Sequence, residues 1–244
     1  MKPRLNRSFL RKHLTATLRV LSRAAVIAGI GLLCISPASA QIRWTSAGQL
    51  EVDATSTSEE GVTVRNAEVG HFDGQNLTIN RSVSSVSGSA TSSAQGDVEV
   101  VPGADGSSLV FSGSLSSATA TDSTATVAKA DALADFTSSF FVDGQSAAYT
   151  ISGNGSVLGV SGSYAIRISS GASVVYDRFV TVGEENFSDT GTLPTGGYAL
   201  EVSTGGTTQL QNSCQTSLDN FVVDLSSTPP TPHTHSDTDA HSYA

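Results

Sequence analysis

Residues 192–203, Thr-Leu-Pro-Thr-Gly-Gly-Tyr-Ala-Leu-Glu-Val-Ser, carry the pattern that decides the fold. A proline and two glycines come near the start, and this combination is typical of a turn, because proline fixes φ and glycine tolerates positive φ. From Tyr198 onward, large apolar residues alternate with small or charged ones. A period of two places one face of an extended strand on a core and the other in water. The stretch therefore predicts a turn followed by a half-buried β-strand.

The same alternation recurs along most of the chain after residue 40. It is found in residues 50–53, 62–65, 77–80, 109–115, 149–151, 164–168 and 221–225. The gaps between these runs, such as 103–106, 143–144 and 153–155, are rich in Gly, Asn and Asp, which predicts turns. Many short antiparallel strands joined by turns are typical of a sandwich or barrel. We therefore expect an all-β fold, an antiparallel β-sandwich that is jelly-roll-like.

Two segments leave the choice of structure open. Residues 123–136 are rich in alanine, the best helix former, but they also alternate. A long strand is favoured over a helix, because the neighbouring segments alternate and no capping residue marks a helix end. Residues 83–94 alternate small polar and small apolar side chains without large anchors. Such a segment specifies its register weakly, so it predicts an edge strand or a loop.

The first 40 residues predict a cleaved signal peptide. Seven basic residues and no acidic ones lie in residues 1–23, a short apolar run follows from Ala24 to Ile35, and Ala38-Ser39-Ala40 supplies the small residues of a cleavage site. The apolar run is shorter than the roughly 20 residues that span a bilayer. We expect cleavage after Ala40 and a secreted, extracellular protein, with the periplasm or the cell surface as further addresses. An organelle transit peptide is the alternative.

After the signal peptide (1–40), we expect a β-sandwich domain at 41–226 and a disordered tail at 227–244. The prolines at 229, 230 and 232 stop the last strand, because proline fixes φ and lacks a backbone donor. Cleavage of the signal leaves Cys214 as the sole cysteine, so no internal disulfide is expected. A buried thiol is favoured for Cys214 over a bridge between chains.

The charge balance excludes some partners. The 244 residues include 13 basic and 22 acidic ones; seven of the basic residues precede position 41, and all of the acidic residues follow it. The exported part is therefore strongly acidic and repels phosphate backbones, so nucleic acid is not an expected partner. No second apolar run is long enough to cross a bilayer, and no membrane span is expected in the mature chain.

A family resemblance extends over roughly residues 112–225. It rests on Phe136-Thr-Ser-Ser-Phe-Phe-Val142, Tyr149-Thr-Ile-Ser-Gly153, the quoted stretch up to Val202, and Leu218-Asp-Asn-Phe-Val-Val223. In this order, the segments are similar to secreted bacterial β-sandwich proteins of the PEP-CTERM-associated type. The resemblance implies a β-sandwich and an exported address. The sorting anchor of that type, a Pro-Glu-Pro motif with a hydrophobic helix and a basic end, does not follow Pro232, which implies a released form.

Motifs for catalysis are absent from the sequence. His71 is the one histidine between positions 41 and 226, and its neighbours predict a surface turn. No Gly-x-Ser-x-Gly elbow, His-Glu-x-x-His motif or P-loop occurs. Glu184 and Glu185 are adjacent and point to opposite sides of an extended chain, so a solvated loop is favoured for them over a glycosidase pair. No catalytic residue is assigned, and a non-enzymatic role is favoured.

Two positions in the expected sandwich are candidates for binding. Trp44 is the sole tryptophan and could serve as a sugar-stacking platform, whereas the tyrosines alternate in phase with Ile, Leu or Val, which predicts core positions. Asp219 precedes Asn220 and is similarly placed to a residue that, in jelly-roll modules, helps to hold a structural Ca²⁺. A turn that starts the last strand is the favoured alternative for this pair.

The tail carries a further candidate metal site. His233, His235, Asp237, Asp239 and His241 all have odd numbers, so an extended chain presents them on one side. Imidazole and carboxylate groups suit zinc, copper or nickel. The alternative, which is favoured, is a polar tail whose histidines bind nothing.

Three functional hypotheses follow. The leading one is an exported, non-enzymatic β-sandwich that acts as an extracellular matrix or cell-surface interaction module, with extracellular polysaccharide or cell-surface components as partners. The second is a carbohydrate-binding module. The third is an exported glycan-acting hydrolase, which would need a cleft with two close carboxylates.

Overall fold

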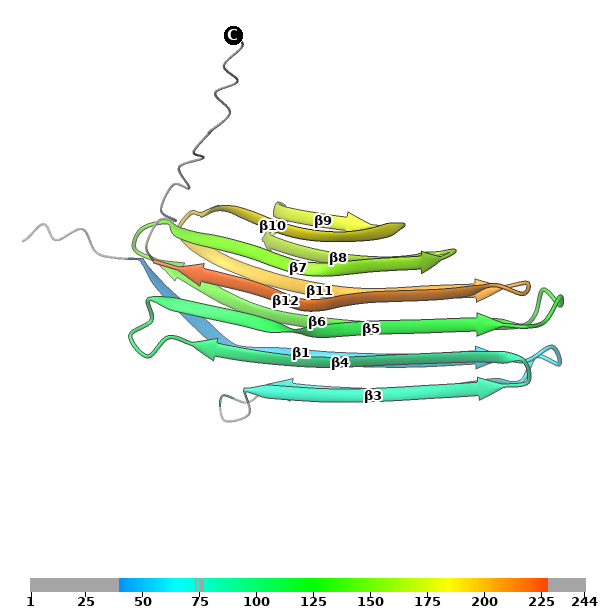
Figure 1. Ribbon diagram of the computed structural model, residues 1–244. Coiled ribbons are helices and arrows are strands. Elements are labelled where there is room, and N and C mark those ends of the chain that lie inside the picture. Colours follow the sequence, from blue (N-terminus) through cyan, green and yellow to red (C-terminus); the bar gives the residue numbers. More distant parts are fainter. Residues whose placement is uncertain (1–39, 73, 75–76, 228–244) are drawn as a thin grey trace, which may run out of the picture. The chain divides into compact units, whose positions relative to one another are not determined.

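The computed structural model describes residues 40–72, 74 and 77–227. In this part of the chain, twelve strands form two six-stranded sheets that pack face to face (Figure 1). The strands are β1 Gln41–Thr57, β2 Thr63–Phe72, β3 Thr78–Ser87, β4 Ala90–Pro102, β5 Ser108–Thr121, β6 Lys129–Asp143, β7 Ala147–Gly159, β8 Gly162–Ser170, β9 Ser173–Val180, β10 Gly183–Leu193, β11 Gly196–Gln209 and β12 Ser213–Ser226. All paired strands run antiparallel, so the expected β-sandwich is confirmed.

Sheet A has the order β2-β1-β6-β11-β8-β9, and sheet B has the order β10-β7-β12-β5-β4-β3. The last eight strands form the two four-stranded halves β6-β11-β8-β9 and β10-β7-β12-β5, which is the strand order of a jelly roll. The first four strands extend both sheets at one side. In sheet A, β1 adjoins β6 and β2 adjoins β1; in sheet B, β4 adjoins β5 and β3 adjoins β4. The jelly roll thus begins at Ser108, close to the start of the region with the family resemblance.

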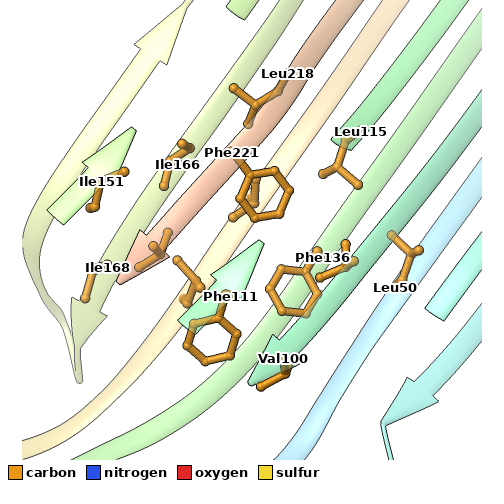
Figure 2. Packing of buried hydrophobic residues seen from close by; sticks show 14 of the residues in the cluster. Leu50, Val100, Phe111, Leu115, Phe136, Ile151, Ile166, Ile168, Leu218 and Phe221 are labelled. Carbon is orange, nitrogen blue, oxygen red and sulfur yellow. The ribbon is translucent and has the colours of Figure 1, made fainter. Parts of the chain in front are cut away.

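The core lies between the sheets and is apolar over much of its length. Figure 2 shows side chains of the two sheets in this layer, among them Phe111 and Phe221 of sheet B and Phe136 of sheet A. Phe111 and Phe136 meet with ring centroids 5.9 Å apart. Every second residue of β6 is buried, and β5 shows the same alternation except at Gly113, as the sequence pattern predicts. Burial of these side chains from water is the main force that holds the sheets together.

The end of the sandwich at which β5 ends and β12 begins has a different interior. Small and hydroxyl-bearing residues replace the large apolar ones there, including Thr119 on β5 and Thr204 on β11. Cys214 is buried in this part and is a free thiol. A Cβ atom on Gly206 would lie 3.0 Å from its Sγ atom. The glycines here leave the space that the facing side chains occupy.

The two segments whose structure the sequence left undecided, 123–136 and 83–94, contain strands. The alanine-rich segment becomes β6 from Lys129 onward, whereas residues 122–128 form an irregular connection with a turn at 126–127. Residues 83–94 divide between β3, which is the edge strand of sheet B, and β4, which is its neighbour. The strand favoured for residues 123–136 is thus confirmed from Lys129 onward but not for residues 123–128, and the edge strand expected within 83–94 is present.

Some expected turns are strand instead. Residues 153–155 lie inside β7, because Gly153 and Gly155 are required by packing rather than by a turn. A Cβ atom on Gly155 would come within 2.2 Å of the Tyr164 ring, and one on Gly153 would lie 3.0 Å from Phe187. Val62 is the second departure: it precedes β2 and is exposed, although the alternation predicted a buried position.

The start of β1 and the residue that follows β12 both bond to the loop between β4 and β5. The Ile42 N–H donates to the carbonyl of Gly106, and the Ser227 N–H donates to that of Ser107. The strands therefore start at Gln41 and end at Ser226 on one side of the sandwich. The predicted signal peptide up to Ser39 and the predicted tail from Thr228 lie outside the described residues. Among those that are described, there is no helix long and apolar enough to cross a membrane.

Candidate functional site

Trp44 lies near the start of β1 and is held against its neighbours. Its indole Nε1 donates a 2.9 Å hydrogen bond to Oγ of Ser138 on β6. Its ring meets Phe72 edge-on, with centroids 5.9 Å apart, and packs partly against the core. The ring therefore has a structural role, and its role as a sugar platform stays a prediction.

Asp219 lies within β12 rather than before it. The register of β12 against β5 shifts between Leu218 and Phe221, and Asn220 has a φ of 51°. The Asn220 N–H donates to Oγ of Ser114 at 3.1 Å. This bulge leaves Asp219 exposed on the outer face of sheet B, directly opposite Asn154 of β7. Bulges commonly redirect a side chain in this way.

Neither metal hypothesis is tested. Residues 40–72, 74 and 77–227 contain no group of three or more His, Cys, Asp or Glu side chains placed to hold a metal ion. The Ca²⁺ role of Asp219 stays a prediction. The tail residues His233, His235, Asp237, Asp239 and His241 lie outside the described residues, so the transition-metal hypothesis also stays a prediction.

His71 and the two adjacent glutamates lie on strands, not in the loops that were expected. His71 is exposed near the end of β2. Glu184 and Glu185 belong to β10, where Glu184 faces outward and Glu185 faces the neighbouring sheet. They point to opposite sides, as an extended chain requires.

Glu185 belongs to an edge cluster that ties the two sheets together. We define this cluster as Tyr164, Tyr176, Arg178, Glu185 and Asp189. Arg178 of β9 donates from Nη1 to Glu185 and from Nη2 to Asp189, both at 2.7 Å. The phenols of Tyr164 and Tyr176 donate to Glu185 and Asp189, respectively. Because β9 and β10 are edge strands of opposite sheets, the cluster closes one open side of the sandwich.

The electrostatics of the edge cluster suit a structural tie. The Tyr164 hydrogen bond and the Arg178 guanidinium lower the pKa of Glu185, and Arg178 and Tyr176 lower that of Asp189. Burial, together with the bond to Asp189, raises the pKa of Tyr176 to about 12. Both carboxylates therefore stay ionised and bound to Arg178, whereas a glycosidase acid needs a raised pKa.

A half-buried carboxyl group lies on the outer face of sheet A. Asp135 of β6 is directly opposite Glu51 of β1, and Glu201 of β11 is two residue pairs away. Its Oδ1 atom is buried without a hydrogen-bond partner among the described residues. Burial and the nearby carboxylates of Glu201 and Glu51 raise the pKa of Asp135 to about 6. This group takes up a proton in mild acid.

The outer face of sheet B carries a polar groove across all six strands. The registers align one residue from each strand in a row, which runs Ser82, Gln95, Ser116, Ser217, Ser156 and Glu184 from β3 to β10. All six line adjoining hollows of about 280 and 350 Å³ that share Ser156 and Ser217. A third hollow of about 380 Å³ shares Gln215 with the first. We call these three hollows the sheet B groove.

The local sequence explains the groove. The central strands β5, β12 and β7 place serine on the row, β4 places the longer Gln95 on it, and β12 places Gln215 beside it. Five strand spacings of about 4.8 Å give the row a length of about 24 Å. Hydroxyl and amide groups both donate and accept hydrogen bonds. The groove can therefore pair with an extended ligand rich in hydroxyl groups.

Charge is distributed unequally between the sheets. Every cation in the described part of the chain forms an ion pair: Arg43, Arg65, Lys129, Arg167 and Arg178 on sheet A, and Arg81 on β3, which pairs with Glu68 of sheet A. The outer face of sheet B bears exposed acids, namely Asp97, Glu99, Glu184, Asp219 and Asp224. No ion pair among the described residues involves these five. The groove thus lies on a face that is neutral or negative throughout.

Sequence reasoning missed both the edge cluster and the groove. The sequence shows that Tyr176 and Arg178 share one face of an extended segment. It does not show that their partners, Glu185 and Asp189, come from the other sheet. The groove depends on strand order, which brings Ser116 and Ser217 side by side although they are a hundred residues apart. The one sign of the groove in the sequence was the run of small polar residues at alternate positions of these strands.

Comparisons with known proteins give no family. No family model and no curated protein matches the chain. One similar solved structure is the enzymatically active domain of bacteriophage CBA120 tailspike protein 4, with 13% identity, a TM-score of 0.28, and coverage of 62% of this chain and 20% of that one. Another is infectious bursal disease virus, Gt strain, with 13% identity, a TM-score of 0.23, and coverage of 78% and 58%. These scores are too low to assign a function.

Proposed function

We propose that the protein is an exported, non-enzymatic interaction module of the extracellular matrix or the cell surface, and that it binds polysaccharide in the sheet B groove. The exported address rests on the predicted signal peptide. The binding role rests on one observation, the row of hydroxyl and amide side chains that crosses six strands.

The chemistry of the groove favours a sugar polymer over other extended ligands. Its floor is uncharged from β3 to β7, so a neutral chain meets no desolvated charge there. Each sugar ring offers several hydroxyl groups, and side-chain hydroxyl and amide groups can bond them in either direction. The strand spacing of about 4.8 Å is close to the repeat of an extended hexose chain. A chain laid across the strands can therefore repeat its contacts from strand to strand.

Affinity electrophoresis against a panel of soluble polysaccharides, neutral and amino-sugar, tests this proposal. We expect retardation by at least one polymer. The double variant Gln95→Ala/Gln215→Ala should weaken binding by about tenfold, since each lost hydrogen bond contributes about 1 kcal/mol or less. Gln209→Ala is the matched control, because Gln209 is exposed at the end of β11 on the other sheet. No retardation by any polymer, or equal binding by all three proteins, would contradict the proposal.

A further inference from the structure

We propose that the polysaccharide bound in the sheet B groove carries free amino groups, so that its ligand is a cationic amino-sugar polymer. This inference rests on the proposed function, because it concerns the same groove. It starts from the charge of the face: each charged residue on the outer side of sheet B is an acid, and the six cations of the described residues are engaged in ion pairs that involve sheet A acids or the edge cluster.

The acids nearest the groove are regularly placed. Asp97 of β4 and Asp219 of β12 lie two residue pairs from the row, on the same side of it, beyond Gln95 and Ser217. Glu184 of β10 ends the row. Counted across sheet B, β4, β12 and β10 are each two strands apart. Measured across the strands, the acids are therefore about 10 Å apart; Glu184 and Asp219 line the groove, and Asp97 lies beside it.

This spacing fits an extended amino-sugar chain. In a β(1→4)-linked polymer, successive rings are turned over, so amino groups on one side recur at every second ring. Two rings of such a chain span about the same length as two strand spacings. A primary ammonium can donate three hydrogen bonds, and a carboxylate accepts them with added charge attraction. Serine and glutamine side chains between the acids are left to bond the ring hydroxyls.

Charge also discriminates among sugar polymers. An anionic polymer would place its carboxylates or sulfates beside Asp97, Asp219 and Glu184 with no cation to pair them. An N-acetylated polymer keeps the hydroxyl contacts but loses the ammonium that the acids attract. The groove should therefore prefer the free amine to its acetylated form, and this preference should weaken as salt screens the exposed charges.

Titration calorimetry with two matched oligosaccharides tests the inference. The probes are the β(1→4)-linked hexamer of glucosamine and the hexamer of N-acetylglucosamine, at a pH of about 5.5, which favours the charged form of the sugar amine. We expect the amine form to bind more tightly and to lose affinity at high ionic strength. Glu184→Gln/Asp219→Asn should weaken its binding by about tenfold and leave the acetylated hexamer unchanged.

The control variant removes equal charge from the same face. Glu99→Gln/Asp224→Asn takes away two exposed acids of sheet B that do not line the groove, and its affinity should stay within about twofold. Hexalysine supplies the charge without the sugar and should bind more weakly than the amine hexamer. Equal binding of both hexamers, equal or tighter binding of hexalysine, or an equal loss in the control variant would overturn the amino-sugar inference alone. If no polysaccharide of the panel binds, the proposed function fails as well.

Discussion

At the scale of single residues, the hydroxyl groups buried inside the sandwich differ in whether they have a hydrogen-bond partner. Side-chain oxygens of Ser117, Thr119, Thr121, Thr204 and Thr208 are buried without a hydrogen-bond partner in the described part of the chain. Other interior hydroxyls are paired: Oγ of Ser56 lies 2.9 Å from Oγ of Ser85 and 3.2 Å from Oγ of Ser92. An unpaired buried hydroxyl costs stability, whereas a paired one contributes to it.

Thr204→Val should therefore stabilise the protein. Thr204 is fully buried, and valine has nearly its shape but no polar oxygen to desolvate. We expect the free energy of unfolding in urea to rise by about 1 kcal/mol. Ser56→Ala is the contrasting variant, because it removes a paired hydroxyl and should lower the same quantity by about 1 kcal/mol. Destabilisation by Thr204→Val would show that the hydroxyl has a partner.

Asp135 gives stability a dependence on pH. Its pKa in the folded protein, about 6, lies above the ordinary value of 3.8, so ionising it disfavours the folded state. The penalty is absent below pH 3.8, grows up to about pH 6 and is complete above it. Because the group is partly exposed, we expect Asp135→Asn to raise the free energy of unfolding by about 1 kcal/mol at neutral pH, and by little near pH 4. Urea denaturation at both pH values measures this, with Glu99→Gln as an exposed control; an equal gain at both values would rule it out.

At the scale of elements, the edge strands β9 and β10 have a partner on one side only. The edge cluster compensates by joining them across the sheets, and the Arg178 guanidinium also lies 4.5 Å above the Phe187 ring centroid. At the opposite side, Arg81 of β3 lies 3.9 Å from Glu68 of β2. Both open sides of the sandwich are thus bridged by an arginine.

Arg178→Ala should loosen the β9–β10 side. Two ion pairs and a cation–π contact are lost, and we expect the free energy of unfolding to fall by about 1 kcal/mol at neutral pH. The pKa values of Glu185 and Asp189 are lowered in the fold, so their contribution is present above about pH 4 and is lost as pH falls further. The deficit of the variant should accordingly shrink in acid. Arg167→Ala breaks a single exposed pair with Asp177 and should change stability by less than about 0.5 kcal/mol. Equal effects of the two variants would contradict a special role for the cluster.

At the scale of the whole molecule, the last two strands occupy the middle of both sheets. β11 lies between β6 and β8, and β12 lies between β5 and β7. Neither sheet is continuous until the end of the sandwich sequence is in place. These pairings are long-range, which favours slow folding.

Hydrogen exchange should reflect this architecture. We expect the slowest amide exchange in β5, β6, β11 and β12, whose backbone groups are paired on both sides and covered by the facing sheet. The edge strands β2, β3, β9 and β10 should exchange faster. Mass spectrometry of peptide fragments after deuterium labelling measures both groups in one experiment. Equal protection of edge and central strands would indicate that a further chain covers the edges.

Alternation along the chain was sufficient to predict the fold class. Tyr164 and Tyr198 were expected in the core from their phase with Ile and Leu, and both are buried. The same rule failed at Gly153 and Gly155, because glycine marks a turn in the sequence but can equally make room for a ring from the other sheet. The strands β9 and β10 were not anticipated, since both are edge strands whose side chains are mostly exposed.

Local sequence thus specifies where strands form and which face of each is apolar, because a period of two is a property of neighbouring residues. It also carries the acidity of the chain and the predicted export signal. Strand order is different in kind: it depends on which apolar faces bury one another when the chain collapses. Only that order brings serines a hundred residues apart into one groove, places five unpaired acids on the outer face of sheet B, and sets Arg178 between two carboxylates of the opposite sheet.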